Sequence, residues 1–572
     1  MSRSKIRKYT AWAICFLAAA AVIYLGSVSG SLPGADEPEL LGRELGILSL
    51  LPVILAVSLA FLSGQVIVSL LVGFFAGILM LTILSGSSPA GAPGMILREI
   101  CSGLVSTACD PENGTVLLLC AAIGGLVEVL CLTGGFNLAA QRLSRHINSP
   151  KKANVASFLF CLLFFFDDYA NALISGPVLK STTDRAGLSR ERLSYVIDST
   201  AAPLAGISIV SSWIAVECSV IGTGLAAAGA GFSAFDVFLR SIPYRFYCIL
   251  CILFVLETAL MNREYGPMLE AERKARRARP AAEAEQTESA APTDREGLRI
   301  AAAIGLVALL LIVTVVSLYV SGRNAAIADG ALASNAAFRL STISTAVSYA
   351  DTIFVVFCST VLCSCVALVL GRLMGLFAPG TGIEAWLKGC AGLIPTVVVL
   401  ILAWSLSGVV GRLGAVHYVV GIISSNVPVF LVPSLIFVSC CLISFAAGSF
   451  GCMFMVMPMA IPIASAVLGA DAMTVDNSFL LLCVSSVLSG SIFGDHCSPM
   501  TDCTILAALG SGCEIMDHVR TQMPYALTTA AVTGVVTVIA ALGLNVWLAI
   551  LLGITANGVI IRLFGKSPDR IE

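Results

Sequence analysis

The decapeptide GDHCSPMTDC, Gly494 to Cys503, places side chains that can bind a cation or a proton inside an otherwise apolar chain. Its candidate site residues are Asp495, His496, Ser498, Thr501 and Asp502. Carboxylates, hydroxyls and freed backbone carbonyls supply the oxygen ligands that a hard cation such as Na+ prefers. An aspartate at the centre of a membrane helix costs about 2.5 to 3.5 kcal/mol on insertion. We therefore interpret the segment as functional rather than as a capped turn at a membrane surface.

A second polar group follows three phenylalanines in FFFDDYAN, where the candidate ion-binding residues are Asp167, Asp168 and Asn171. A carboxyl group beside a like-charged neighbour in poorly solvated surroundings can bind either a proton or a cation. The alternative is a loop mouth with solvated acids, which fits one of the two aspartates better than both. This segment is expected to share a site with the decapeptide.

A third group, in VIDSTAAP, consists of Asp198, Ser199 and Thr200. A hydroxyl near a helix start often serves only as a cap, and this is the alternative for Ser199 and Thr200. The corresponding window of the other half of the chain carries Asp495, which favours a paired site. Ser449, in AAGSFGCM, is a further candidate ligand. The predicted Na+ ligands are Asp168, Asp198 and Asp495.

The four histidines differ in their sequence surroundings. His496 is the only one of the four that lies in a polar motif, and imidazole titrates in the range where it can modulate a response to pH. We expect His146, His417 and His518 in loops or interfaces.

The composition indicates where these groups must be held. Hydrophobic residues make up 58% of the 572 residues, charged residues 12%, and the mean hydropathy is +0.95, whereas soluble domains are about one quarter charged. Apolar runs of about 18 residues or more, the length that spans a bilayer, recur along the chain. The net charge of -2 does not indicate nucleic acid as a partner. No GxxxxGK[ST] phosphate loop is present, which argues against an ATP-driven pump, and we expect no enzyme activity, no catalytic residues and no cofactor.

The elements that position the polar groups recur in the same order in both halves. LFFFDDYANALISGP corresponds to SFAAGSFGCMFMVMP, and VIDSTAAPLAGISIVSSW to SIFGDHCSPMTDCTILAA. Basic segments flank residues 153–181 on both sides and should both be cytoplasmic, which predicts a re-entrant hairpin. A helix broken near Pro203 follows, and the second half repeats the scheme with a break at GDHCSP, where Ser498 and Pro499 are expected to begin the next helix. The prediction is an all-α polytopic membrane protein with two inverted-topology repeats, each with a re-entrant hairpin and a broken transmembrane helix.

The predicted organisation has four parts: N-terminal transmembrane helices (1–114), a first transport repeat (115–261), a cytoplasmic linker without a core of its own (262–299), and a second repeat with C-terminal helices (300–572). The first apolar segment is expected to be a retained helix rather than a signal peptide. Both termini are expected on the cytoplasmic side of a bacterial or archaeal cell membrane. Most of the 20 cysteines lie in apolar runs, and a disulfide between Cys101 and Cys109 is a weakly supported option.

At FFFDDYANALISGP, RERLSYVIDSTAAP, SSW and above all FGDHCSPMTDCTIL, the sequence resembles the NhaC family of Na+/H+ antiporters, from about Leu117 to Ile561. The resemblance implies a secondary exchanger of inverted repeats, with Na+ and H+ as transported ions. It also implies Asp167, Asp168, Asp198, Asp495 and Asp502 as ion-handling carboxylates.

The sequence departs from its relatives at four positions: Gly448, Phe450 and Cys452 stand where relatives often have Thr, Trp and Thr, and Cys503 stands at a usual Thr position. Because hydroxyl ligands are lost, the alternative function is Na+- or H+-coupled exchange of a small organic anion or amino acid, with a small carboxylate solute as partner. A channel is a third option, against which the paired hairpins argue. A homodimer is compatible with this class of protein.

Overall fold

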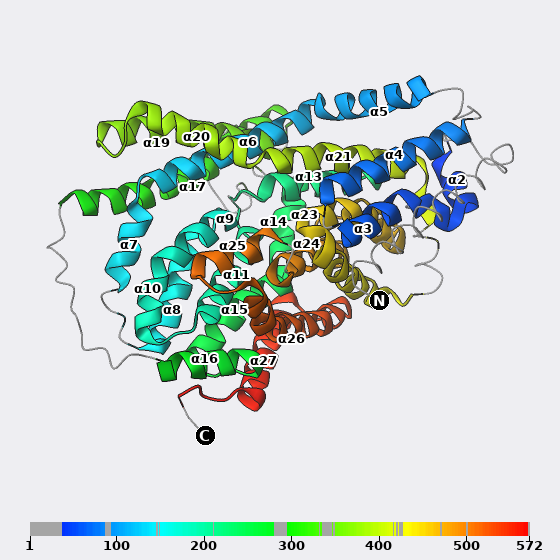
Figure 1. The fold of residues 1–572 in the computed structure, drawn as a ribbon. Coiled ribbons are helices and arrows are strands. Elements are labelled where there is room, and N and C mark those ends of the chain that lie inside the picture. The colour runs from blue at the N-terminus through cyan, green and yellow to red at the C-terminus, as the bar shows by residue number, and fades with distance from the viewer. Residues whose placement is uncertain are drawn as a thin grey trace. The chain divides into compact units, whose positions relative to one another are not determined.

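The computed structural model describes residues 37–569 except 64, 86–92, 145–146, 148, 210, 279–293, 331, 335–341, 343–345, 347–348, 416, 419–420, 422–426, 470–471 and 499–500. Within these residues the fold is all helical (Figure 1), and strand pairing is confined to one isolated bridge between Glu264 and Lys566. The predicted first helix and residues 279–293 of the predicted linker lie outside the described residues.

The helices before the midpoint of the chain are α2 (Pro38–Leu45), η2 (Gly46–Leu50), α3 (Leu51–Ser63), α4 (Val66–Leu84), α5 (Pro93–Ala108), α6 (Pro111–Leu132), α7 (Gly135–Ser144), α8 (Pro150–Cys161), η4 (Leu162–Phe164), α9 (Asp168–Ala170), η5 (Asn171–Ser175), α10 (Gly176–Ala186), α11 (Arg190–Thr200), α12 (Ala202–Ala205), α13 (Ile214–Ala227), α14 (Ala234–Ser241), η6 (Ile242–Tyr244), α15 (Phe246–Met261) and α16 (Gly266–Ala278). The remaining helices are α17 (Asp294–Ala328), α19 (Thr352–Leu373), α20 (Pro379–Gly392), α21 (Ile394–Arg412), η7 (Val429–Leu431), α23 (Val432–Leu468), α24 (Ser478–Cys497), α25 (Asp502–Ser511), α26 (Ile515–Ala541) and α27 (Val546–Phe564).

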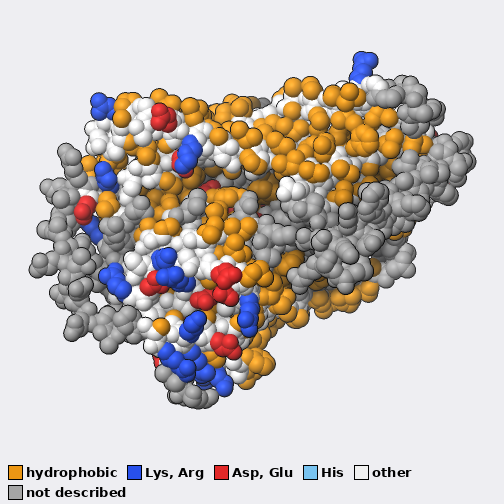
Figure 2. Space-filling view, in the orientation of Figure 1, with side chains coloured by type: hydrophobic (Ala, Val, Ile, Leu, Met, Phe, Trp, Pro, Cys, Tyr) orange, Lys and Arg blue, Asp and Glu red, His pale blue; other side chains and the backbone are white. Residues whose placement is uncertain are grey.

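Several of these helices have the length and the exposed apolar side chains of lipid-facing helices. Among the described residues, nine helices are long and apolar enough to span a membrane, or up to ten if a bent pair is one span. Large apolar side chains are exposed along them, for example Trp547, Leu551 and Leu563 on α27, which are 66%, 57% and 72% exposed. Figure 2 shows apolar side chains over wide areas of one face, while Lys and Arg gather at its lower edge, around α16 and the C-terminal segment. The predicted class of an all-α polytopic membrane protein is confirmed.

The helices form two compact units that interleave along the chain. The first unit contains the residues up to Leu117, Val216–Tyr244 and Pro395–Gly494. The second unit contains Leu118–Ala215, Arg245–Ile394 and Asp495–Glu572. Each unit thus draws on both sequence repeats. The inversion of one repeat relative to the other stays a prediction, as do the sequence limits of the four predicted parts.

The predicted first hairpin is present in the second unit. Ser149 caps α8 by accepting a hydrogen bond from Lys152 N, and Gly187, at a left-handed φ of 81°, ends α10. The chain reverses between these helices, because Ala153 at the start of α8 packs with Ala186 at the end of α10. The tip contains the short helices η4 and α9 and the π-helix η5, a form that often occurs at functional sites.

The second hairpin lies in the first unit and turns at Gly448. This glycine adopts φ 71° and ψ 170°, which interrupts α23. Cys452 Sγ donates a hydrogen bond to the Cys440 carbonyl at 3.5 Å, although twelve residues of straight helix would separate the two by about 18 Å. The two arms of α23 therefore fold back on each other, as the sequence predicts.

Both broken helices are also observed. Ala201, at φ −84° and ψ −92°, separates α11 from α12, close to the expected break at Pro203. In the other repeat α24 ends at Cys497 and α25 begins at Asp502 after Thr501. The prediction that Ser498 and Pro499 begin the second half-helix is therefore wrong, because extended Thr501, at φ −89° and ψ 143°, is the N-cap of α25.

Two further expectations need correction. The predicted linker is not without a core at its start: Met268 and Glu272 of α16 are buried, and α16 packs against α26 and α11. An i, i+4 spacing of inward side chains explains this, since it places Met268, Glu272 and Arg276 on one face. Cys101 and Cys109 are both free and exposed, as are Cys358 and Cys365.

The first hairpin contacts the second broken helix through two glycines. Gly176 of α10 lies so close to Gly510 of α25 that a Cβ on Gly176 would come within 2.4 Å of the Gly510 carbonyl carbon. Glycine is needed here because backbone, not a movable side chain, fills the space. The contact brings the hairpin tip against the helix that follows the break.

We expect Gly176→Ala to destabilise the protein by about 1–3 kcal/mol, as overpacking of a close contact does. Gly305→Ala on α17 is the matched control, because a Cβ there meets nothing within 4 Å and alanine favours the helix. Thermal unfolding of both purified variants in detergent checks this. Equal unfolding midpoints for the two variants would show that the hairpin and α25 can move apart without loss of stability.

Candidate functional site

The candidate site lies in the second unit, around the carboxylate of Asp198. Asp198 is 1% exposed and sits in the last turn of α11 before the break. Its Oδ2 accepts a hydrogen bond from Gln522 Nε2 at 2.7 Å, and lies 3.2 Å from Thr504 Oγ1 and 3.1 Å from His518 Nε2. Its Oδ1 is buried without a hydrogen-bond partner among the described residues. One oxygen is thus fixed by protein donors and the other is left able to bind an ion.

Asp168, at the hairpin tip, has the same asymmetry. Its Oδ2 accepts a hydrogen bond from Cys503 Sγ at 3.0 Å, while its Oδ1 is buried and has no partner in the described part of the chain. Asp168, Asp198 and Asp495 all act electrostatically on the Cys503 thiol. The three predicted Na+ ligands are therefore brought to one region of the second unit from three distant points of the sequence.

Asp167 and Asn171, both predicted as ligands, also make structural hydrogen bonds at the hairpin tip, and their role as ligands stays a prediction. Asp167 is the N-cap of α9, and its Oδ1 accepts from Ala170 N at 2.6 Å. Asn171 donates from Nδ2 to the Thr200 carbonyl at 3.0 Å, and its Oδ1 accepts from Ser175 Oγ at 2.8 Å. Asn171 thereby ties the hairpin tip to the break of α11, and its amide oxygen is already engaged.

His496 forms a buried chain of polar groups. Its Nε2 lies 2.6 Å from Ser199 Oγ and its Nδ1 lies 2.7 Å from the Tyr247 hydroxyl. Because a neutral imidazole donates from one nitrogen and accepts at the other, the ring can serve both neighbours in either tautomer. His496 thus links α11, α15 and the end of α24.

The backbone that the second break frees is satisfied by side chains. Thr504 Oγ1 lies 2.6 Å from the Asp495 carbonyl oxygen, and Thr501 Oγ1 donates to the Ser498 carbonyl at 3.0 Å. Gln522 Nε2 donates to the carbonyl of His496. Non-helical backbone at membrane depth needs such partners because lipid offers none. The break is therefore a fixed part of the site.

The remaining predicted residues are distributed as follows. Asp495, Ser498 and Thr501 are buried in the second unit near the break. Ser449 is buried in the first unit, next to the Gly448 turn. The side chain of Asp502 lies outside the described part of the structure, as does His146, and His417 is exposed.

The prediction for His518 is wrong, and Gln522 and Thr504 were missed. His518 and Gln522 are both 0% exposed and contact Asp198 directly. They lie one turn apart on α26, and buried Tyr525 and Thr529 continue the same face. This polar stripe at i, i+4, i+7 and i+11 was a usable signal within an apolar segment.

A second buried polar cluster lies at the start of α11. The Arg192 guanidinium is 0% exposed and donates to Glu264 Oε2 at 3.1 Å and to Thr258 Oγ1 at 2.6 Å. Tyr525 also donates to Glu264 Oε2. Glu264 follows the end of α15, and burial raises the pKa of its carboxyl to about 7, against the opposing effect of Arg192. This carboxylate joins α11 and α26, the two helices that hold Asp198 and its donors.

We expect Glu264→Gln to flatten the dependence of stability on pH. The pKa of the Glu264 carboxyl is about 7 in the folded protein, above the value of about 4.3 in an unfolded chain. The stability that this group contributes is therefore fully present below about pH 4.3 and is lost as the pH rises through 7. The unfolding midpoint of the parent should therefore fall from about pH 5 to about pH 8 more steeply than that of the variant. Glu270→Gln, at an exposed position of α16, should keep the parental slope. Identical slopes in all three proteins would exclude Glu264 as the titrating group.

Comparison with known proteins places the chain among transporters. A sequence model of the Na+/H+ antiporter family matches residues 204–542. An uncharacterized protein of Haemophilus influenzae is 28% identical over 498 residues, which cover 87% of this chain and 91% of that protein. Among solved structures, the YdaH transporter of Alcanivorax borkumensis, which has an unusual topology, aligns with a TM-score of 0.51 at 15% identity over 80% of this chain and 91% of its own. Neisseria gonorrhoeae MtrF, whose structure and function were described for a class of antimetabolite efflux pumps, aligns with a TM-score of 0.42 at 13% identity over 83% of this chain and 96% of its own.

Proposed function

The chain belongs to the Na+/H+ antiporter family and is a multi-pass secondary transporter, and on that premise we propose that it exchanges Na+ for H+ at Asp198. The observation that carries the proposal is the Asp198 carboxylate itself. It is buried, three neighbouring side chains fix Oδ2, and Oδ1 has no partner among the described residues. A buried anionic oxygen without a partner is costly unless a cation or a proton binds it.

The neighbouring oxygens suit a sodium ion. Asp168 Oδ1 and Gln522 Oε1 are also buried acceptors without a partner in the described part of the chain. Carboxylate and amide oxygens are ligands that a hard cation prefers. We assign Asp198 and Asp168 as the principal ligands, with Asp495 as a third carboxylate near the break. Na+ is cargo here and no resident cofactor is required.

Competition between the two ions couples their movement. A carboxylate that binds Na+ must give up a proton to do so, and a carboxylate that binds a proton loses most of its attraction for Na+. If the site changes the side that it faces only while it holds one of the two ions, each ion is carried across the membrane only in exchange for the other. The interrupted helices α11 and α24/α25 provide the non-helical backbone at the site that alternating access uses in other transporters.

The alternative cargo is a small organic anion. Cys503 favours it, because the thiol donates to Asp168 where relatives often have a threonine hydroxyl. The excess of carboxylates around Cys503 favours a cation, since a carboxylate solute would be repelled. We further propose that the protein works in a bacterial or archaeal cell membrane with both termini cytoplasmic, and a homodimer stays a prediction.

We expect Asp198→Asn to abolish exchange while leaving the fold intact, because asparagine keeps the size and some hydrogen bonds but cannot ionise. Proteoliposomes with an imposed pH gradient test this: added Na+ should dissipate the gradient with the parent and not with the variant. Asp168→Asn and Asp495→Asn should behave alike. The matched control is Asp184→Asn, which changes an exposed aspartate paired only with Arg190 and should leave exchange unaltered.

Near-parental exchange by well-folded Asp198→Asn protein would remove this residue from the mechanism. A separate counterflow measurement with a panel of solutes decides the cargo. We expect Na+ alone to support dissipation of the pH gradient. A requirement for an added amino acid or organic anion would replace Na+/H+ exchange by the alternative function.

A further inference from the structure

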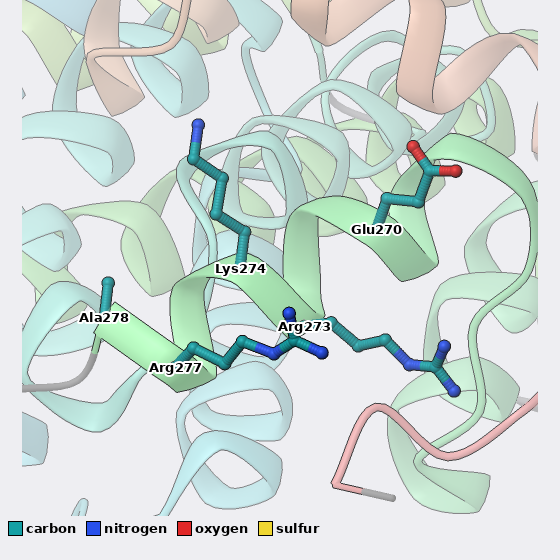
Figure 3. Close-up of a pocket in the computed structure, with 5 residues that line it drawn as sticks. All are labelled: Glu270, Arg273, Lys274, Arg277 and Ala278. Atoms are coloured by element: carbon teal, nitrogen blue, oxygen red, sulfur yellow. The ribbon is translucent and has the colours of Figure 1, made fainter. Parts of the chain in front are cut away.

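We propose that α16 carries a binding site for the headgroup of an anionic phospholipid. The site consists of Arg273, Lys274 and Arg277, which together with Glu270 and Ala278 of the same helix line an open surface hollow of about 570 Å³. Figure 3 shows Arg273 and Arg277 extending in the same direction along the helix. Their spacing of four residues places them on one face. A surface hollow of this volume has room for a phosphate-bearing headgroup.

The position of α16 relative to the spanning helices indicates a lipid rather than a protein partner. The bridge between Glu264 and Lys566 joins the chain just after α15 to the chain just after α27. Leu260 at the end of α15 and Leu563 and Phe564 at the end of α27 are 51%, 72% and 67% exposed, as lipid-facing residues are. Since α16 begins five residues after α15 ends, its basic face lies at the level of the headgroups. Basic clusters in this position attract anionic lipids.

The helix is held rigidly enough to present a formed site. On its inner face, Glu272 accepts from Ser189 N at 2.8 Å and from Arg276 Nη2 at 3.0 Å. Arg276 also pairs with Asp569 of the C-terminal segment. These contacts neutralise the charge of Arg276. Among the described residues that line this hollow, three are basic and one, Glu270, is acidic, and this balance of charge favours an anion.

The inner contacts connect this site to the ion site. Ser189, whose backbone Glu272 holds, is the N-cap of α11, and its hydroxyl accepts from Arg192 N at 3.1 Å. The last turn of the same helix carries Asp198. A headgroup that stabilises α16 therefore also stabilises the start of the helix that positions the ion-binding carboxylate. Binding itself does not depend on the proposed cargo.

The test uses the purified full chain in neutral detergent, with thermal unfolding measured during titration with short-chain phosphatidylglycerol. We expect the lipid to raise the unfolding midpoint, and short-chain phosphatidylcholine and inorganic phosphate to have little effect. In the variant R273Q/K274Q/R277Q the half-saturating concentration should rise by roughly a hundredfold, as expected from the loss of three charges near a headgroup. K151Q/K152Q, which removes two exposed lysines of α8, should titrate like the parent.

Two single variants keep the test decisive if the triple variant is unstable. K274Q changes an exposed side chain and should weaken the response, whereas Glu270→Gln removes the opposing charge and should strengthen it. Equal responses to phosphatidylglycerol and phosphatidylcholine, or an unchanged response in K274Q and Glu270→Gln, would overturn the proposal. A full response to inorganic phosphate would overturn the lipid source and assign a soluble anion. Because unfolding is measured without transport, failure here leaves the ion-exchange proposal unaffected.

Discussion

The hydrogen bonds to one oxygen of Asp198 are the interaction on which the geometry of the candidate site depends. Its neighbours come from α25 and α26, so a single carboxylate joins the end of α11 to two helices that lie about 300 residues later in the chain. Hydrogen bonds to a charged group contribute about 1.5–3 kcal/mol each. A group fixed so firmly on one side can present its other oxygen at a constant position, which is what recognition of a small ion requires.

The break in each helix is stabilised by the same few residues. Asn171 satisfies the Thr200 carbonyl at the first break, and Gln522 satisfies the His496 carbonyl at the second. Gln522 also donates to Asp198, so the geometry of the break and that of the ligand cannot change independently. The cluster of Arg192, Glu264 and Tyr525 extends this coupling to the edge of the unit, since Tyr525 lies on the face of α26 that carries Gln522.

The sequence was sufficient for the parts of the site that are polar where the chain should be apolar. The burial of Asp168, Asp198 and Asp495 could be predicted because each residue interrupts a hydrophobic run, while their role as ligands stays a proposal. The first hairpin could be predicted because its hydrophobic run is flanked by basic segments on both sides. His518 could not be placed, because its partner is 320 residues away and no local rule specifies which face of α26 meets α11. The hydrogen bond from Ser175 to the Asn171 amide oxygen could not be predicted for a similar reason, because only the π-helical geometry of the tip determines it. The start of the linker was misread because composition conceals an i, i+4 pattern of inward residues.

The distribution of thiols has a practical consequence for spectroscopy. Cys101, Cys109, Cys358 and Cys365 are exposed, whereas Cys251, Cys440, Cys497 and Cys503 are buried. A maleimide or nitroxide reagent reacts with thiolates that water reaches. The native chain should therefore label at Cys101 and Cys109 rather than at Cys358 and Cys365, which lie within a candidate membrane span, or at buried Cys503 beside Asp168. Cys101 and Cys109 both belong to the first unit, so a probe there can report on that unit without any change to the residues around the candidate site.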